Sequence, residues 1–207
     1  MRAEQVVYAV DDDRRFLTAL ERTLRTSRYD VRCYQSAGDF LDQFDPNQPG
    51  CVISDLCMPE MDGLALQQAL KNRNVSLPVI FITGYGDTRK AVAALKEGAF
   101  DFIEKPFGEK TLLDSVRQAL EKNAEERRQL SEQLLVEERF GSLTPREKEI
   151  FALVVSDLSN KQIARRLDIS PRTVEHHREH VMLKMQAHSM AELVTSAVLC
   201  GIHKLHL

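Results

Sequence analysis

Four short apolar runs in the first half of the chain each end in residues that can contact a charged ligand. The polar residues that follow these runs are, in order, Asp11-Asp12-Asp13, Asp55, Thr83 and Lys105-Pro106. Pro49-Gly50 and Pro59 bound the second run, which is typical of a short buried strand. Parallel strands bring their carboxyl ends to one edge of a sheet, where open α/β sheets bind ligands. We therefore expect these polar groups to share one crevice.

Strand and helix patterns alternate five times between residue 6 and about residue 120. This alternation predicts an α/β domain with a doubly wound five-stranded parallel sheet. The expected helices cover approximately 14–27, 37–44, 64–72 and 88–97, and a fifth begins at 109. Gly98 suits the left-handed position that ends the fourth helix.

The composition excludes several classes of protein. No run approaches 18 apolar residues, and the N-terminal segment, with Glu4 and Asp11, lacks a signal-peptide core. We therefore expect no membrane association and a location in the cytoplasm. The four cysteines form no CxxC pair and no metal-ligand spacing, which favours reduced, buried thiols.

The fifth helix continues beyond the first domain. Leu130 and Leu134 keep a three-four spacing with earlier apolar positions, but Asn123 and Arg127 interrupt the same seam. We interpret residues 121–141 as a solvated helical linker between a first domain, 1–120, and a second, 142–207. The alternative is a helix that pairs across a dimer.

The last 66 residues predict a small all-α domain. Start signals for four helices occur at Thr144-Pro145, Ser159, Ser170-Pro171 and Ser189, and Gly201 ends the fourth. This segment carries nine basic and seven acidic residues and all six histidines of the chain. The balance is compatible with nucleic-acid binding but does not establish it. Residues 158–185 predict a helix, a tight turn and a second helix.

The acidic residues of the first domain indicate a cation site. Asp11, Asp12 and Asp55 would repel one another in one crevice unless a cation lay among them, and hard oxygen ligands suit Mg²⁺. A carboxylate at Asp55 could act as a nucleophile and accept a phosphoryl group. Lys105 would neutralise the transferred oxygens, and Thr83 would donate a hydrogen bond to one of them.

An enzyme of another class uses similar residues. Asp11-x-Asp13 after a strand, with a later Thr83 and Lys105, is also compatible with a haloacid-dehalogenase-type phosphohydrolase in which Asp11 is the nucleophile. That enzyme needs a further acidic pair after the lysine, whereas Glu109 and Asp114 fall within a helix pattern. It also leaves Asp55 without a function.

Residues 5–120 resemble the receiver domain of two-component response regulators through the acidic pair, Asp55-Leu-Cys-Met-Pro59, Thr83-Gly84 and Lys105-Pro106. The resemblance implies strand order 2-1-3-4-5 and phosphorylation of Asp55 by a sensor histidine kinase. It implies that Mg²⁺, or Mn²⁺, is held by Asp12, Asp55 and the Cys57 carbonyl, with Asp11 acting through water. It implies a switch pair, Thr83 and Phe102, where Phe replaces the common Tyr, and a cis Lys105-Pro106 bond.

Residues 142–202 resemble the LuxR/FixJ/NarL helix-turn-helix through Leu143-Thr-Pro-Arg-Glu147, Ser159-Asn-Lys-Gln-Ile-Ala164 and Ser170-Pro-Arg-Thr-Val-Glu-His-His177. With the receiver, this implies a FixJ-type transcriptional regulator that binds double-stranded DNA, with homodimerisation on phosphorylation. The residues expected to touch the DNA backbone are Asn160, Lys161, Arg172, Thr173 and Arg178. Those expected to face bases are Glu175, His176 and Glu179.

Two alternatives concern this second domain. His176 and His180 lie one helical turn apart and could bind zinc, but no second acidic or thiol pair accompanies them, which favours DNA-facing and packing roles. The chain could also bind DNA constitutively and use its receiver only for dimerisation.

Overall fold

The computed structural model describes residues 5–84 and 97–202. The chain divides into two compact units, residues 1–127 and 128–207, and each is described by itself. The boundary falls within the segment 121–141 that we interpreted as a linker. Among the described residues, no helix is long and apolar enough to cross a membrane.

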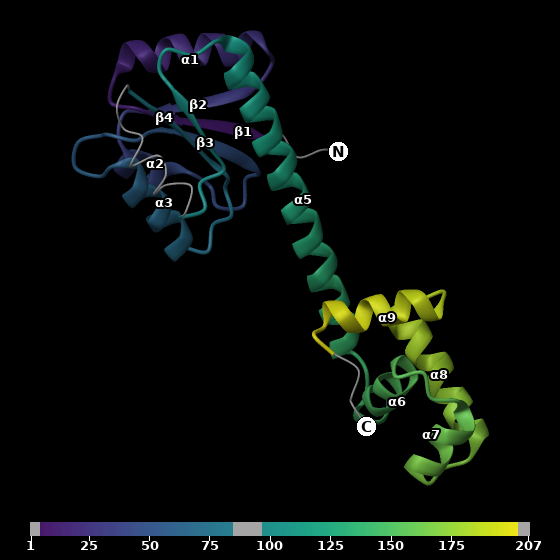
Figure 1. The fold of residues 1–207 in the computed structure, drawn as a ribbon. Helices are drawn as coiled ribbons and strands as arrows, with labels where there is room; N and C mark the ends of the chain where they lie inside the picture. Colours follow the sequence, from purple (N-terminus) through teal and green to yellow (C-terminus); the bar gives the residue numbers. More distant parts are fainter. Residues whose placement is uncertain (1–4, 85–96, 203–207) are drawn as a thin grey trace. The chain divides into compact units, whose positions relative to one another are not determined.

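The first unit is a five-stranded parallel sheet in the predicted order β2-β1-β3-β4-β5 (Figure 1). Its strands are β1 (Val6–Val10), β2 (Asp30–Tyr34), β3 (Gly50–Asp55), β4 (Val79–Thr83) and β5 (Asp101–Glu104). Its helices are α1 (Arg14–Thr26), α2 (Ala37–Gln43), α3 (Gly63–Asn72) and the beginning of α5 (Glu109–Gly141). The predicted helix boundaries agree within one residue. The helix predicted at 88–97 lies outside the described residues except for Glu97, and Gly98 has the expected positive φ of 82°.

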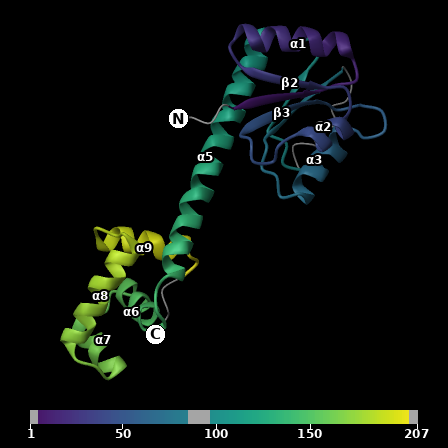
Figure 2. The same ribbon diagram turned by 180° about the vertical axis from the view of Figure 1, so that it is seen from behind.

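Alternate residues of the strands build two apolar layers, because successive side chains point to opposite faces of a sheet. Tyr8, Val52 and Phe81 face Phe40 of α2 and Leu66 of α3. On the other face, Ile53 and Ile82 belong to the layer that α1 and α5 cover. The two views of the ribbon show α1 and α5 on one side of the sheet and α2 and α3 on the other (Figures 1 and 2).

Asn123 differs from its expected role as a polar interruption of the α5 seam. The side chain is fully buried, and its amide donates to the carbonyl of Ser76 at 2.6 Å. Its side-chain oxygen accepts from the backbone N–H of Gly50 at 3.0 Å. A buried amide with both functions satisfied stabilises the packing of α5 on the sheet.

The second unit contains the end of α5 and the four predicted helices. They are α6 (Pro145–Val155), α7 (Asn160–Leu167), α8 (Pro171–Met185) and α9 (Met190–Leu199). Each helix begins after the residue predicted to cap it, and Thr144 and Ser159 form reciprocal capping boxes with Glu147 and Gln162. Their apolar faces meet in one core. Asp168 ends α7 in a left-handed conformation with φ of 52°, which produces the tight turn before α8.

Candidate functional sites

The strand register places the predicted polar groups at one edge of the first unit. Val10 pairs with Ser54, Asp55 pairs with Ile82, and Thr83 pairs with Glu104. The residues that follow β1 and β5, Asp11 and Lys105, therefore lie at the same edge as Asp55 and Thr83. The parallel sheet positions these groups through the ends of its strands.

Lys105 joins the two carboxylates nearest the sheet. Its ammonium lies 3.1 Å from Oδ1 of Asp55 and 3.2 Å from Oδ2 of Asp11. It also lies 3.9 Å from the centre of the Phe16 ring, a cation–π contact. Burial disfavours the charged ammonium, but the hydrogen bond to Asp55 and the charge of Asp11 more than offset this, so the pKa of Lys105 is raised. The lysine therefore remains cationic between the carboxylates.

Asp11 is the buried member of this cluster, with 4% of its side chain exposed. Burial raises the pKa of Asp11 above its ordinary value, although the Asp13 backbone N–H and the Lys105 ammonium favour the charged form. A carboxylate whose charge is disfavoured by burial gains from a further cation nearby. The environment of Asp11 is thus suited to a cation.

Asp12 and Asp13 have different environments. Asp13 caps α1, because its carboxylate accepts from the backbone N–H groups of Arg15 and Phe16. Asp12 is exposed at the edge. No three acidic, histidine or cysteine side chains of the described residues lie close enough together to hold one metal ion.

The donor set nevertheless fits Mg²⁺. Magnesium is commonly bound by one or two protein carboxylates, with water and substrate oxygens completing its coordination. Asp11 and Asp55 already converge on one cation, the Lys105 ammonium. Cys57 is exposed, and its backbone N–H donates to Oδ2 of Asp55 at 2.8 Å, which fixes the turn after β3 beside the carboxylate.

Thr83 and Phe102, the predicted switch pair, lie on neighbouring strands. Thr83 is 2% exposed, and its carbonyl accepts from the backbone N–H of Lys105 at 2.8 Å. Its hydroxyl donates to the Gly84 carbonyl at 3.3 Å. Phe102 is half-buried against the layer that contains Phe81. The Lys105-Pro106 bond is cis, as expected.

The second candidate site is the outer face of α8. Val174, Val181 and Met185 are buried against the domain core. The exposed residues of the opposite face include Arg172, Thr173, Glu175, His176 and Glu179. Lys161 is exposed near the start of α7. A helix with this separation of faces has the form that enters the DNA major groove.

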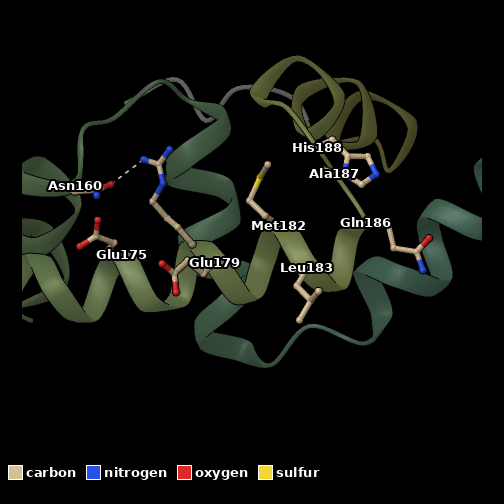
Figure 3. Close-up of a pocket in the computed structure, with 9 residues that line it drawn as sticks. Asn160, Glu175, Glu179, Met182, Leu183, Gln186, Ala187 and His188 are labelled. Atoms are coloured by element: carbon tan, nitrogen blue, oxygen red, sulfur yellow. Dashed lines mark hydrogen bonds between the residues drawn. The ribbon is translucent and has the colours of Figure 1, made fainter.

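Asn160 and Arg178 contact each other. Nη1 of Arg178 donates to Oδ1 of Asn160 at 2.8 Å, and Nη2 lies 3.6 Å from the sulfur of Met190. The half-buried guanidinium therefore joins α7 and α8 to the beginning of α9. The two residues line an open groove of about 850 Å³ beside α8, drawn in Figure 3. Glu175 and Glu179 extend from the same helix beside it.

Glu147 has a larger role than its cap position indicated. The side chain is 4% exposed and accepts from the ammonium of Lys184 on α8 at 2.6 Å. Burial raises its pKa, but the bonds from Lys184 and from the N–H and hydroxyl of Thr144 outweigh this and lower the pKa of Glu147 to about 2. This ion pair connects α6 to α8. Sequence spacing gives no signal for it, because Lys184 follows 37 positions later.

The histidines of α8 do not form a three-ligand metal cluster within the described part of the chain. The rings of His176 and His180 lie 4.2 Å apart between centroids. Nδ1 of His180 lies 3.6 Å from Oε1 of Glu147. His180 therefore lies against Glu147 of α6, and His176 is exposed next to Glu175 on α8.

Comparisons with known proteins match both units. Residues 7–117 match the family model described as "Response regulator receiver domain", and residues 141–197 match "Bacterial regulatory proteins, luxR family". The chain is 41% identical to the response regulator protein TodT of Pseudomonas putida F1 over 91% of this chain and 83% of that protein. It is also 41% identical to the transcriptional regulatory protein FixJ of Azorhizobium caulinodans, over 95% of this chain and 93% of that protein.

Solved structures show the same similarity. The response regulator StyR aligns with a TM-score of 0.85 at 39% identity, covering 95% of this chain and 99% of that one. Full-length FixJ from B. japonicum aligns with a TM-score of 0.60 at 37% identity, covering 97% and 99%.

Proposed function

The chain belongs to the response regulators that combine a receiver domain with a LuxR-type DNA-binding domain, and from this membership we propose that Asp55 is its phosphoacceptor. One observation carries the proposal: the ammonium of Lys105 lies within hydrogen-bonding distance of both Asp55 and the buried Asp11. This arrangement supplies a nucleophile and a counter-charge at the edge of the sheet.

In the proposed step, a carboxylate oxygen of Asp55 forms a bond to the phosphorus of a phosphohistidine on a sensor kinase. The phosphorus–nitrogen bond breaks, and the histidine nitrogen keeps the electron pair. Lys105 stabilises the charge on the transferred oxygens, and the hydroxyl of Thr83 turns to donate to one of them. Asp12, Asp55 and the Cys57 carbonyl would hold Mg²⁺ or Mn²⁺ directly, and Asp11 would act through a water molecule. Such an ion supplies electrostatic stabilisation of the phosphoryl oxygens.

The new phosphoryl group adds charge and acceptor oxygens beside Thr83. Movement of Thr83 toward it would change the packing of Phe102, because the two residues lie on adjacent strands. We propose that this change promotes pairing of two copies through the receiver. Because the residue on β5 is Phe102, its side chain acts through packing and not through a hydroxyl.

Pairing would place two α8 helices on adjacent half-sites of double-stranded DNA. Lys161, Arg172 and Thr173 are proposed backbone contacts, and Glu175, His176 and Glu179 face bases. Asn160 and Arg178 contact the DNA backbone as a hydrogen-bonded pair, since the side-chain amide of Asn160 holds the guanidinium of Arg178 in place. Because the proposed partners, promoter DNA and the kinase domain of a sensor, are found in the cytoplasm, we expect the regulator to act in the cytoplasm.

The decisive experiment measures Mg²⁺-dependent uptake of label from radioactive acetyl phosphate. Asp55→Asn should abolish labelling. Asp62→Asn provides a matched control, because the Asp62 carboxylate caps α3 by accepting from the Ala65 N–H, and asparagine is an equally good cap. Label on the Asp55→Asn variant would show that the phosphoacceptor is another residue.

DNA affinity measured with and without acetyl phosphate separates the two regulatory alternatives. If acetyl phosphate raises the DNA affinity of the wild-type chain but not that of Asp55→Asn, phosphorylation controls DNA binding. Unchanged affinity in a fully labelled chain would support constitutive binding. The phosphohydrolase alternative is excluded by the family membership, and the capping role of Asp13 agrees with this.

A further inference from the structure

The middle of α5 carries two exposed leucines on one face. Leu130 and Leu134 are one helical turn apart, and each is 56% exposed. They continue the three-four seam on which Val116, Leu120 and Asn123 are buried against the sheet. An apolar pair left exposed on a seam of this spacing is suited to packing against a second helix.

On the seam, the two leucines are flanked by one charged residue of each sign. Arg127 precedes Leu130 by three positions, and Glu137 follows Leu134 by three. Both are exposed, and one N–H of Arg127 donates to the Asn47 carbonyl. A guanidinium has five donors, so this contact leaves others available. The exposed seam therefore reads Arg127, Leu130, Leu134 and Glu137.

We propose that this seam is an interaction surface for the same segment of a second copy of the chain, packed antiparallel. A two-fold axis beside residue 132 places Leu130 opposite the partner's Leu134. It also places Arg127 opposite the partner's Glu137, at both ends of the contact. Every layer of the antiparallel pair is then either apolar or charge-complementary.

A parallel pair of the same helices is disfavoured by these charges. In parallel register each residue meets its own copy, so Arg127 would face Arg127 and Glu137 would face Glu137. Like charges in core layers of a coiled coil oppose pairing, and charges are what usually fix orientation. The residues that flank the centre of the antiparallel pair, Ser131 and Gln133, are uncharged and do not oppose it.

This association goes beyond the proposed function, because it does not depend on the phosphoryl group. Two leucines from each copy bury much less than the roughly 1,200 Å² of a stable interface. The pair is consequently weak and concentration-dependent. We therefore expect it to form transiently, including between unphosphorylated chains.

Charge reversal tests both the surface and the orientation in the full-length chain. The measurement is sedimentation equilibrium of the Asp55→Asn variant, so that phosphorylation cannot contribute to self-association. Arg127→Glu or Glu137→Arg alone creates two like-charged layers, and each should weaken self-association roughly tenfold or more. The double variant R127E/E137R restores opposite charges in every antiparallel layer and should recover association.

Arg128→Glu is the matched control. It changes the net charge by the same amount as Arg127→Glu but lies off the seam, where Arg128 pairs with Glu132 at 3.6 Å, and it should leave association unchanged. A double variant that stays as weak as the single variants would overturn the antiparallel arrangement. A chain that remains monomeric at every concentration, or single reversals without effect, would overturn the proposal that two copies pair through the seam. None of these sedimentation outcomes affects the labelling of Asp55 in the wild-type chain. The proposed pairing of α5 and the proposed phosphoacceptor can therefore be refuted independently.

Discussion

The ammonium of Lys105 lies 3.1 Å from Oδ1 of Asp55, although 50 residues separate them in the sequence. The contact exists because β3 and β5 both end at one edge of a parallel sheet. Lys105 therefore lies where its ammonium could stabilise the oxygens of a phosphoryl group that is transferred to Asp55.

Replacing Lys105 by Met should slow labelling of Asp55 by acetyl phosphate. Loss of one positioned charge at a developing oxyanion costs roughly 10²- to 10³-fold in rate. Lys110→Met is the matched control, because Lys110 is exposed at the start of α5. The measurement is the initial rate of labelling at saturating Mg²⁺. Equal rates in the two variants would remove Lys105 from the chemistry.

Glu147 should make stability depend on pH in the acid range. Its pKa is lowered from 4.5 to about 2 in the folded chain, so the unfolded state binds protons first as the pH falls. The stabilisation is complete above about pH 4.5 and disappears as the pH approaches 2. Glu147→Gln should lower the free energy of unfolding at pH 7 by about 1 to 3 kcal/mol.

Calorimetric unfolding between pH 2 and 7 checks this prediction. The difference between wild type and Glu147→Gln should shrink as the pH falls. Glu149→Gln is the control, since Glu149 is exposed and, among the described residues, its carboxylate pairs with Arg146 on the same helix, α6. A difference that stays constant with pH would mean that the Glu147 carboxylate is not the source of the stabilisation.

The sequence predicted what depends on periodicity and on the ends of elements. The alternation of strands and helices predicted the sheet, and the strand ends predicted that Asp55 and Lys105 would meet. Capping signals such as Thr144 and Ser159 predicted where helices begin. These features are local, or follow from the single rule that parallel strands end at one edge.

The contacts that the sequence did not predict are long-range pairs of polar residues. Asn123 looked like an interruption of a coiled-coil seam, but it satisfies backbone groups of Gly50 and Ser76. The bond of Lys184 to Glu147 depends on how α8 crosses α6. Such pairs leave no periodic signal, since they depend on the angle at which two elements pack.

Glu175 should affect which bases are selected more than how tightly DNA is bound. It is exposed on the outer face of α8, where a carboxylate can accept from the amino group of cytosine. Selection of bound DNA from a random pool should therefore recover a different preference at one position for Glu175→Ala. Glu149→Ala, on another helix, serves as the control and should recover the wild-type sequence. An unchanged preference for Glu175→Ala would exclude it from base recognition.

Arg178 should contribute to both stability and DNA affinity, because its guanidinium is held by Asn160 before DNA arrives. Arg178→Ala should lower the free energy of unfolding by about 1 kcal/mol through the lost hydrogen bond. It should also reduce the salt dependence of DNA binding by about one phosphate contact. Lys161→Ala should produce only the second effect, since Lys161 is exposed and its ammonium forms no hydrogen bond or ion pair with the described residues. If Arg178→Ala destabilises the domain while the salt slope stays at the wild-type value, Arg178 joins α7 to α8 without touching a phosphate.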